Sequence, residues 1–300
     1  MREVRQLATA FFILPRGKAQ PGSSKVPLHC RGVRTTNECD AFGPPVRRRV
    51  DAGALLRYED NDKDATMKHQ KYVGLLAMLL AILWIPLAFD PFDRKDWLLE
   101  NVLSMLALAT LAATYRSFPL SRISYTLIFL FLCLHTVGAY YTYAQVPYDD
   151  WWRALTGTTF NEMVGWRRNN FDRVVHFCYG LLLAYPIREL FLRVAGVKGF
   201  WGYFLPLDLT MSTSMLYELI EWLAAEFFGG DLGMAYLGTQ GDVWDAHKDM
   251  ALASLGALIC MSVTAYVNSR IRRDFAQEWN ESLRIKSPEP LGEEALVRIP

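Results

Sequence analysis

Three aspartates stand at the start of the last long apolar stretch of the chain. Asp242, Asp245 and Asp249 are spaced i, i+3, i+7 and precede the run ALASLGALICMSVTAYV, so they share one face of a helix that would begin near Asp242. Together with His176 they form a set of metal-ligand candidates, because imidazole and carboxylate are ordinary ligands of divalent metals. The sequence therefore leaves two interpretations open, a divalent metal as cofactor or a proton relay, since histidine also titrates near neutral pH.

Further ionisable residues lie near the ends of other apolar stretches. Asp172 and His176 are at i and i+4, and Glu218 and Glu221 are at i and i+3, so each pair shares a helix face. These four residues are the candidate catalytic groups, with His176 as the acid/base and Glu218 as a ligand or base. Three more residues are predicted to line the same polar cavity: Glu100, His135 and Arg173.

These charges allow two interpretations. A charged side chain near the bilayer centre costs about 2.5–3.5 kcal/mol on insertion scales, which favours a functional role for the cluster. The structural alternative is a buried ion pair from Arg173 to Glu218 or Glu221. In that case Asp242 or Asp245 would serve only as an ordinary helix N-cap.

Membrane-spanning helices are the elements that must position these residues. The net charge of +1 and the hydrophobic fraction of 52% fit soluble and membrane proteins alike, but after Asp64 apolar blocks of roughly 17 to 26 residues alternate with short polar connections. Backbone amides in lipid must be satisfied within their own segment, which favours helices. The sequence predicts an all-α polytopic membrane helix bundle of about six transmembrane helices, at residues 72–89, 98–115, 122–144, 172–192, 201–228 and 248–267.

The basic residues that flank these spans favour both termini in the cytoplasm, because Lys and Arg are retained on that side of a membrane. More of them fall on the side of the two termini than on the opposite side. With this orientation, the polar residues would line a cavity open to the outer side.

The segments outside the spans lead to separate expectations. Residues 1–66 are charged and rich in Pro and Gly, so they are either a disordered cytoplasmic tail or a segment upstream of the true initiator, Met67. Residues 67–270 form the predicted six-helix transmembrane domain, and residues 271–300 a cytoplasmic tail. The Gly-rich connection FFGGDLGMAYLGTQGD, residues 227–242, is predicted to fold over the cavity as a lid.

Three blocks of the sequence resemble the YjdF-like bacterial inner-membrane proteins, a family defined as a domain of unknown function: DRVVHFCYGLLLAYPIREL, MLYELIEWLAAEFFG and GTQGDVWDAHKDMALASLGAL. The resemblance covers about residues 70–270 and implies a multi-pass protein of the bacterial inner membrane. The chain is more distantly similar to the VanZ-like family, associated with glycopeptide (teicoplanin) resistance, although Glu221 stands where Gln is frequent in that family. The resemblance carries over to Asp172, His176, Glu218, Glu221, Asp245 and Asp249 and implies no reaction.

Three classes of function remain open, and the sequence does not decide whether the protein is an enzyme. The first is an enzyme or binding protein for a lipid-linked or amphiphilic molecule at the outer leaflet. The second is a small proton-coupled transporter, in which the histidines and Glu218 and Glu221 relay protons. The third is a structural or assembly role in the lipid bilayer. The short arginine run at 47–49 is balanced by acidic residues downstream and gives no reason to expect a nucleic-acid partner.

Overall fold

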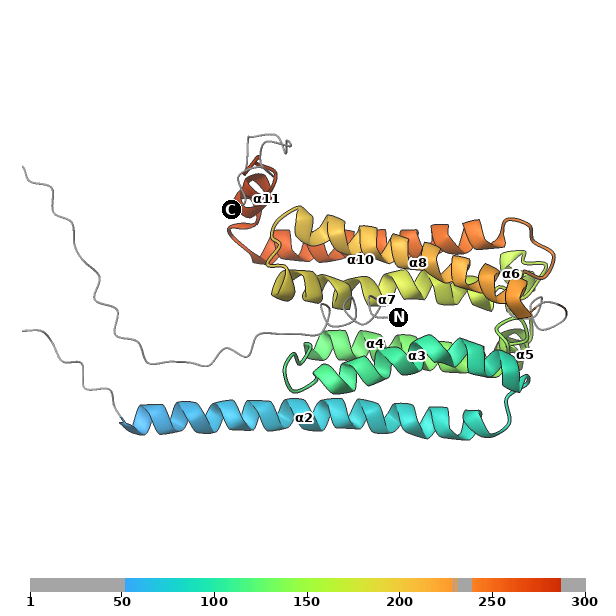
Figure 1. The fold of residues 1–300 in the computed structure, drawn as a ribbon, viewed down its shortest axis with the longest axis horizontal. Helices are drawn as coiled ribbons and strands as arrows, with labels where there is room; N and C mark the ends of the chain where they lie inside the picture. Colours follow the sequence, from blue (N-terminus) through green and yellow to red (C-terminus); the bar gives the residue numbers. More distant parts are fainter. Residues whose placement is uncertain (1–51, 229, 231–238, 287–300) are drawn as a thin grey trace, which may run out of the picture. The chain divides into compact units, whose positions relative to one another are not determined.

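The described part of the chain consists of helices joined by turns and short connections. The computed structural model describes residues 52–228, 230 and 239–286, and no strand occurs among them. The long helices are α2 (Ala52–Phe89), α3 (Arg94–Thr114), α4 (Arg122–Tyr140), α7 (Phe171–Val194), α8 (Trp201–Phe228) and α10 (Asp245–Ile271) (Figure 1). The short helices are α5 (Tyr148–Thr156), α6 (Phe160–Val164) and α11 (Phe275–Ser282).

Five described segments are long and apolar enough to cross a membrane: Thr66–Phe89, Arg94–Thr114, Arg122–Tyr140, Phe171–Val194 and Asp245–Ile271. The 28 residues of α8 also suffice in length, but four carboxylates spread along this helix set its composition apart from the other five. The six predicted spans fall on these six long helices, and the prediction of an all-helical polytopic membrane bundle is confirmed.

The predicted tails differ in part from what the structure describes. Helix α2 begins at Ala52, so residues 52–66 of the predicted N-terminal tail are helical, and the first 51 residues lie outside the described part. The predicted C-terminal tail contains α11, while residues 287–300 lie outside the described part. Most of the predicted lid at 227–242 also lies outside the described residues, so the lid stays a prediction.

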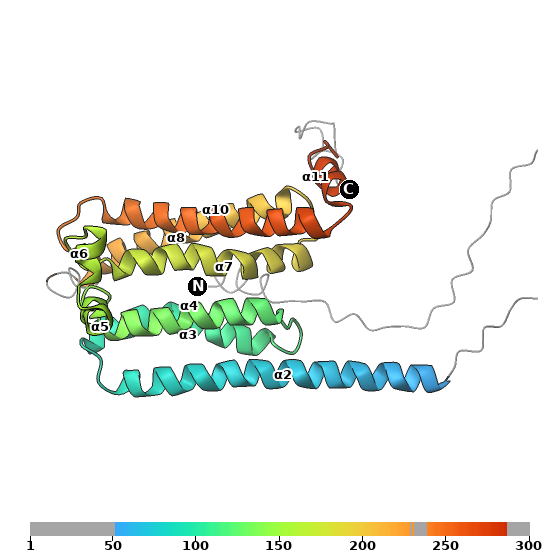
Figure 2. The same cartoon turned by 180° about the vertical axis from the view of Figure 1, so that it is seen from behind.

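Successive long helices alternate in direction, and this brings distant parts of the sequence to one end of the bundle. The starts of α3, α7 and α10 lie at the end that carries α5 and α6, together with the final turns of α4 and α8 (Figures 1 and 2). The amide of Phe92 donates to the carbonyl of Tyr140 (3.1 Å) and joins the turn before α3 to the end of α4. We call this the α5–α6 end; α11 lies at the opposite end.

Small residues allow α7 and α10 to pack closely. A Cβ atom at Gly180 of α7 would lie 1.8 Å from the carbonyl oxygen of Ala253, and one at Gly256 of α10 would lie 2.2 Å from that of Phe177. These glycines therefore bring the two backbones to a separation that other residues would prevent. The ionisable residues in the first turns of α7 and α10 consequently face one another.

Candidate functional site

The site residues predicted from the sequence lie toward the α5–α6 end of the bundle. The structure places them as follows: Asp172, Arg173 and His176 on α7, Glu218 and Glu221 on α8, Asp245 and Asp249 on α10, Asp242 in the turn before α10, Glu100 on α3 and His135 on α4. They form two groups. The larger group joins α7, α8 and α10, and the smaller one joins α3 and α4.

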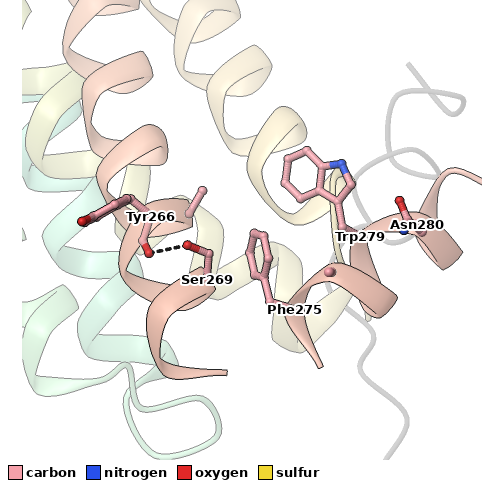
Figure 3. Close-up of a pocket in the computed structure, with 7 residues that line it drawn as sticks. Tyr266, Ser269, Phe275, Trp279 and Asn280 are labelled. Atoms are coloured by element: carbon pink, nitrogen blue, oxygen red, sulfur yellow. Dashed lines mark hydrogen bonds between the residues drawn. The ribbon is translucent and has the colours of Figure 1, made fainter. Parts of the chain in front are cut away.

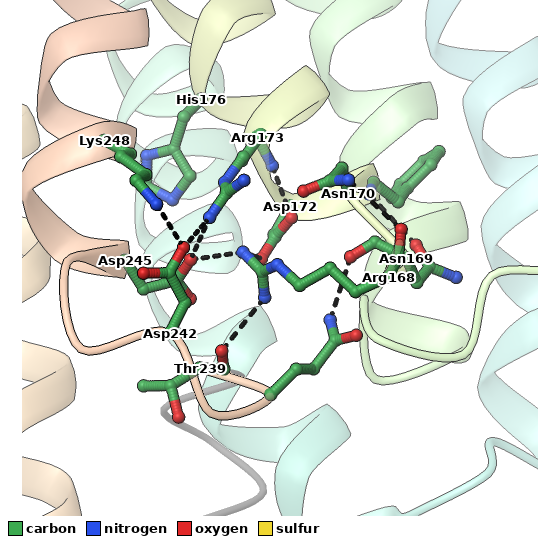
Figure 4. Close-up of polar contacts among 12 residues, drawn as sticks. Arg168, Asn169, Asn170, Asp172, Arg173, His176, Thr239, Asp242, Asp245 and Lys248 are labelled. Carbon is green, nitrogen blue, oxygen red and sulfur yellow. Dashed lines mark hydrogen bonds and ion pairs between the residues drawn. The ribbon is translucent and has the colours of Figure 1, made fainter. Parts of the chain in front are cut away.

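Two arginines hold the start of α10 against the start of α7 (Figure 4). Asp245, 5% exposed, accepts hydrogen bonds from Arg168 and from Arg173, the latter over 3.0 Å. Arg168 also donates to the carbonyl of Thr239 (3.1 Å) and to the carboxylate of Asp172 (3.3 Å). Asp245 is thus the shared acceptor of a buried two-arginine network, and such charge-assisted bonds are among the stronger ones in proteins.

Asp242 joins this network through Arg173 and lies on its more exposed side. Its carboxylate accepts from Lys248 (2.6 Å), from the amide of Trp244 (3.1 Å) and from Arg173. The Lys248 contact, then the amide and the arginine, hold the pKa of Asp242 well below its usual range. A lowered native pKa means that these contacts stabilise the fold above the unfolded pKa of about 4, and that their contribution is lost as the pH falls through the native pKa.

The structure corrects the ion pair that the sequence suggested for Arg173. Arg173 pairs with Asp242 and Asp245 and not with Glu218 or Glu221, because it lies in the first turn of α7, against the start of α10. Neither aspartate caps α10, since the N-cap residue is Trp244 and makes no side-chain cap bond. The helix begins at Asp245, so Asp242 belongs to the preceding turn and not to the helix face predicted for it.

A second set of acidic groups lies beside the network but has fewer partners. His176, Glu218 and Asp249 each bring one ligand atom within 4.8 Å of the other two. Among the described residues, Glu218 Oε1 and Asp249 Oδ1 are buried and accept no hydrogen bond, and Glu218 Oε1 lies 3.6 Å from His176 Nε2, beyond hydrogen-bond range. Asp172, Asp245 and Asp249 also converge, but Asp172 and Asp245 already accept from arginines.

Tyr217 connects the larger group to the smaller one. Its hydroxyl donates to Glu100 (2.9 Å), which is 5% exposed and joins α3 to α8. The Tyr217 ring also lies edge-on to the ring of His176, with centroids 5.9 Å apart. Glu221 lies one helical turn after Glu218 on α8, so carboxyl groups extend from the α7–α10 contact toward α3.

His135 is held at both ring nitrogens. Its Nε2 lies 2.6 Å from the hydroxyl of Ser104 on α3, and its Nδ1 lies 2.5 Å from the hydroxyl of Tyr143. Tyr143 and the preceding Thr142 have φ values of 52° and 53°, a left-handed conformation that is uncommon for residues other than glycine and costs free energy. This backbone turns the Tyr143 ring back over Gly138, whose missing side chain leaves space for it.

We expect Gly138→Ala to displace Tyr143 from His135. A Cβ atom at this position would lie 2.5 Å from the Tyr143 ring, and overpacking of this kind costs about 1–3 kcal/mol. Thermal unfolding of the purified variant in detergent, compared with the parent, measures this loss of stability. In a Tyr143→Ala background the same Gly138→Ala change should cost much less; an equal cost in both backgrounds would contradict the proposed contact.

Sequence reasoning missed four residues of the site: Arg168, Ser104, Tyr143 and Tyr217. Arg168 lies four residues before Asp172 and pairs with it, but it precedes α7, which begins at Phe171, so helical spacing does not identify it. The others carry no sequence signal, since a hydroxyl within an apolar or aromatic stretch gives no indication of which distant helix it will contact.

Comparison with known proteins agrees with this architecture. The chain matches the family described as "Predicted membrane protein (DUF2238)" over residues 72–270. It is 37% identical over 200 residues to the inner membrane protein YjdF of Escherichia coli (strain K12), a match that covers 66% of this chain and 91% of that protein. No solved structure matches the chain. The YjdF-like resemblance is confirmed, the VanZ-like one stays a prediction, and the chain belongs to the DUF2238 family of predicted membrane proteins.

Proposed function

We propose that this membrane protein binds a divalent cation between α7, α8 and α10, with His176, Glu218 and Asp249 as ligands. One observation carries the proposal: the three ligand atoms converge within 4.8 Å, while two buried carboxylate oxygens among them have no hydrogen-bond partner in the described part of the chain. A buried carboxylate oxygen without a partner is costly, and the hydrogen bond that the Glu218 carboxyl shares with Glu221 brings no positive charge. A bound cation would compensate this cost and would also be coordinated by the imidazole of His176.

The ligand set indicates the class of cation. Mixed imidazole and carboxylate ligands suit Zn²⁺ or Mn²⁺, whereas Mg²⁺ and Ca²⁺ prefer oxygen ligands alone. Three protein ligands would leave coordination positions open, as in catalytic metal sites. Asp172 and Asp245 would contribute negative charge near the cation but have their own arginine partners, so they orient the site and do not compete for the cation.

The open positions would accept an oxygen ligand of a substrate, and the membrane setting favours an amphiphilic or lipid-linked molecule. A phosphate or ester oxygen of such a molecule could coordinate the cation, which would polarise it as a Lewis acid. With both termini in the cytoplasm of a bacterial inner-membrane protein, the site would face the outer leaflet. Insertion of a reporter after α11 and one in the α5–α6 connection tests this orientation, and a cytoplasmic signal from the second reporter would contradict it.

Cation binding is tested by elemental analysis and by titration of Zn²⁺ and Mn²⁺ into detergent-purified protein after exchange into metal-free buffer. We expect one stoichiometric cation in the parent protein. Removing one of three ligands, in Asp249→Asn or Glu218→Gln, should weaken the affinity at least about tenfold, as loss of even an outer-shell partner commonly does.

The matched control is Asp208→Asn. Asp208 is an exposed carboxylate in the other half of α8, so this variant changes a charge on the same helix away from the site. It should bind the cation as the parent does. If the folded Asp249→Asn variant keeps the parent's affinity, or the parent binds no divalent cation, the proposal is wrong and the acidic group has another role.

A further inference from the structure

A hollow of about 420 Å³ lies at the end of the bundle opposite the cation site. It lies between the last turns of α10 and helix α11; Phe275 and Trp279 project from α11 toward it, whereas the Tyr266 ring lies on the side of α10 away from them (Figure 3). Ala265, Ser269, Ala276 and Asn280 complete its lining. It is a shallow depression that is open along one side, a shape that suits a flexible chain lying in it.

Contacts with the start of α8 fix the α11 wall of the hollow. The Trp201 indole donates to the carbonyl of Ser282 (2.9 Å), the amide of Phe200 donates to the Ser282 hydroxyl (2.9 Å), and the amide of Gly199 donates to Glu278 (3.2 Å). Phe275 and Trp279 also pack against Tyr203 and the buried core around it. The hollow is therefore bounded by a docked helix.

The surroundings of the hollow combine an apolar face with positive charge. Val263, Tyr266 and Val267 are 56%, 61% and 44% exposed on one face of α10, a face suited to lipid chains. Arg270 and Arg273 follow at the end of this helix and are exposed. Among the described residues neither arginine has a carboxylate within 4 Å, whereas Arg272 between them pairs with Glu278 (2.6 Å).

We propose that this hollow binds an acyl chain of an anionic phospholipid, with the phosphate of its headgroup on Arg270 and Arg273. The exposed apolar face of α10 lies within about one helical turn of the residues that line the hollow, so an acyl chain along this face would reach the hollow. The two arginines at the rim supply the charge complementary to a phosphate. Trp279 and Tyr266 belong to the side-chain types that anchor proteins at the membrane–water interface.

The test uses the full chain in nanodiscs and a phosphatidylglycerol whose acyl chain carries a photoreactive diazirine. After irradiation, labelled peptides are identified by mass spectrometry. In the parent protein we expect labelling of the segment 265–280. Each of the substitutions Arg270→Gln and Arg273→Gln should reduce this labelling about fivefold, and the double variant should show both reductions. Ala276→Trp, which places a ring in the hollow, should reduce the labelling even though both arginines remain.

A control variant and a control lipid probe show whether the labelling is specific to the hollow and to an anionic headgroup. Arg153→Gln removes an exposed arginine of α5 at the other end of the bundle and should leave the labelling of 265–280 unchanged. A phosphatidylcholine probe with the same diazirine reports contact with any lipid chain. Equal labelling by the two probes, or labelling that folded Ala276→Trp leaves unchanged, would overturn the proposal, because lipid would then only surround α10.

Discussion

Gly180→Ala is expected to be the most damaging small substitution in the described part of the chain. The added Cβ atom would lie 1.8 Å from the carbonyl oxygen of Ala253 and 2.7 Å from the amide nitrogen of Ala257. Both are backbone atoms of α10, so no side chain can rotate away and the helix itself must move. We expect a loss of about 3 kcal/mol, the upper end of the usual cost of overpacking.

The effect should reach the proposed cation site. His176 lies one turn before Gly180 on α7, and Asp249 lies one turn before Ala253 on α10, so separating the helices there separates the two ligands. In Gly180→Ala, the unfolding temperature in detergent and the affinity for Zn²⁺ or Mn²⁺ should therefore both decrease.

Gly74→Ala is the matched control for this substitution. Gly74 is also within a long helix, but a Cβ atom there has nothing within 4 Å. Alanine is favoured over glycine in a helix by about 1 kcal/mol, so this variant should be as stable as the parent or more so. If Gly180→Ala is equally well tolerated, α7 and α10 are not in the close contact described.

The sequence predicted the helices well because the bilayer leaves few alternatives. Apolar stretches of sufficient length must form helices in lipid, and the expected spans agree with the observed helices to within several residues at most ends. The larger differences occur in the polar segments. Helix α2 continues toward the N-terminus into residues 52–66, where the composition alone suggested a tail.

Pairing within the site could be predicted only in part. Placing residues by depth predicts that Asp172, His176, Glu218, Glu221 and the acidic residues of α10 lie toward the same end, where the structure has them. Depth does not reveal which helix faces which, so the sequence favours Glu218 or Glu221 as the partner of Arg173, whereas the structure pairs Arg173 with Asp242 and Asp245. Helix rotation is set by contacts such as those of Gly180 and Gly256, whose role appears only when the facing helix is known.

Asp245→Asn is expected to destabilise the fold strongly and Asp249→Asn is not, although the two aspartates are one turn apart on α10. Asp245 accepts from Arg168 and Arg173, and breaking a buried charge pair on one side costs about 3–5 kcal/mol because the remaining charges stay buried. Asp249 is 4% exposed and its Oδ1 has no partner among the described residues. In metal-free buffer its replacement should be neutral or stabilising, because it removes an uncompensated buried carboxylate.

Adding the cation should then distinguish the parent from Asp249→Asn. A ligand that binds only the folded state stabilises it by RT ln(1 + [L]/Kd), about 2.7 kcal/mol at a hundredfold excess over Kd. Unfolding measured with and without Zn²⁺ or Mn²⁺ should show this increase in the parent and little of it in Asp249→Asn. An identical increase in both proteins would mean that the cation binds elsewhere. In metal-free buffer, equal destabilisation by Asp245→Asn and Asp249→Asn would mean that Asp249 has a structural partner of its own. The expected signs follow from the same arrangement: the arginines neutralise Asp245, whereas Asp249 Oδ1 and Glu218 Oε1 have no hydrogen-bond partner among the described residues and can bind a cation with His176.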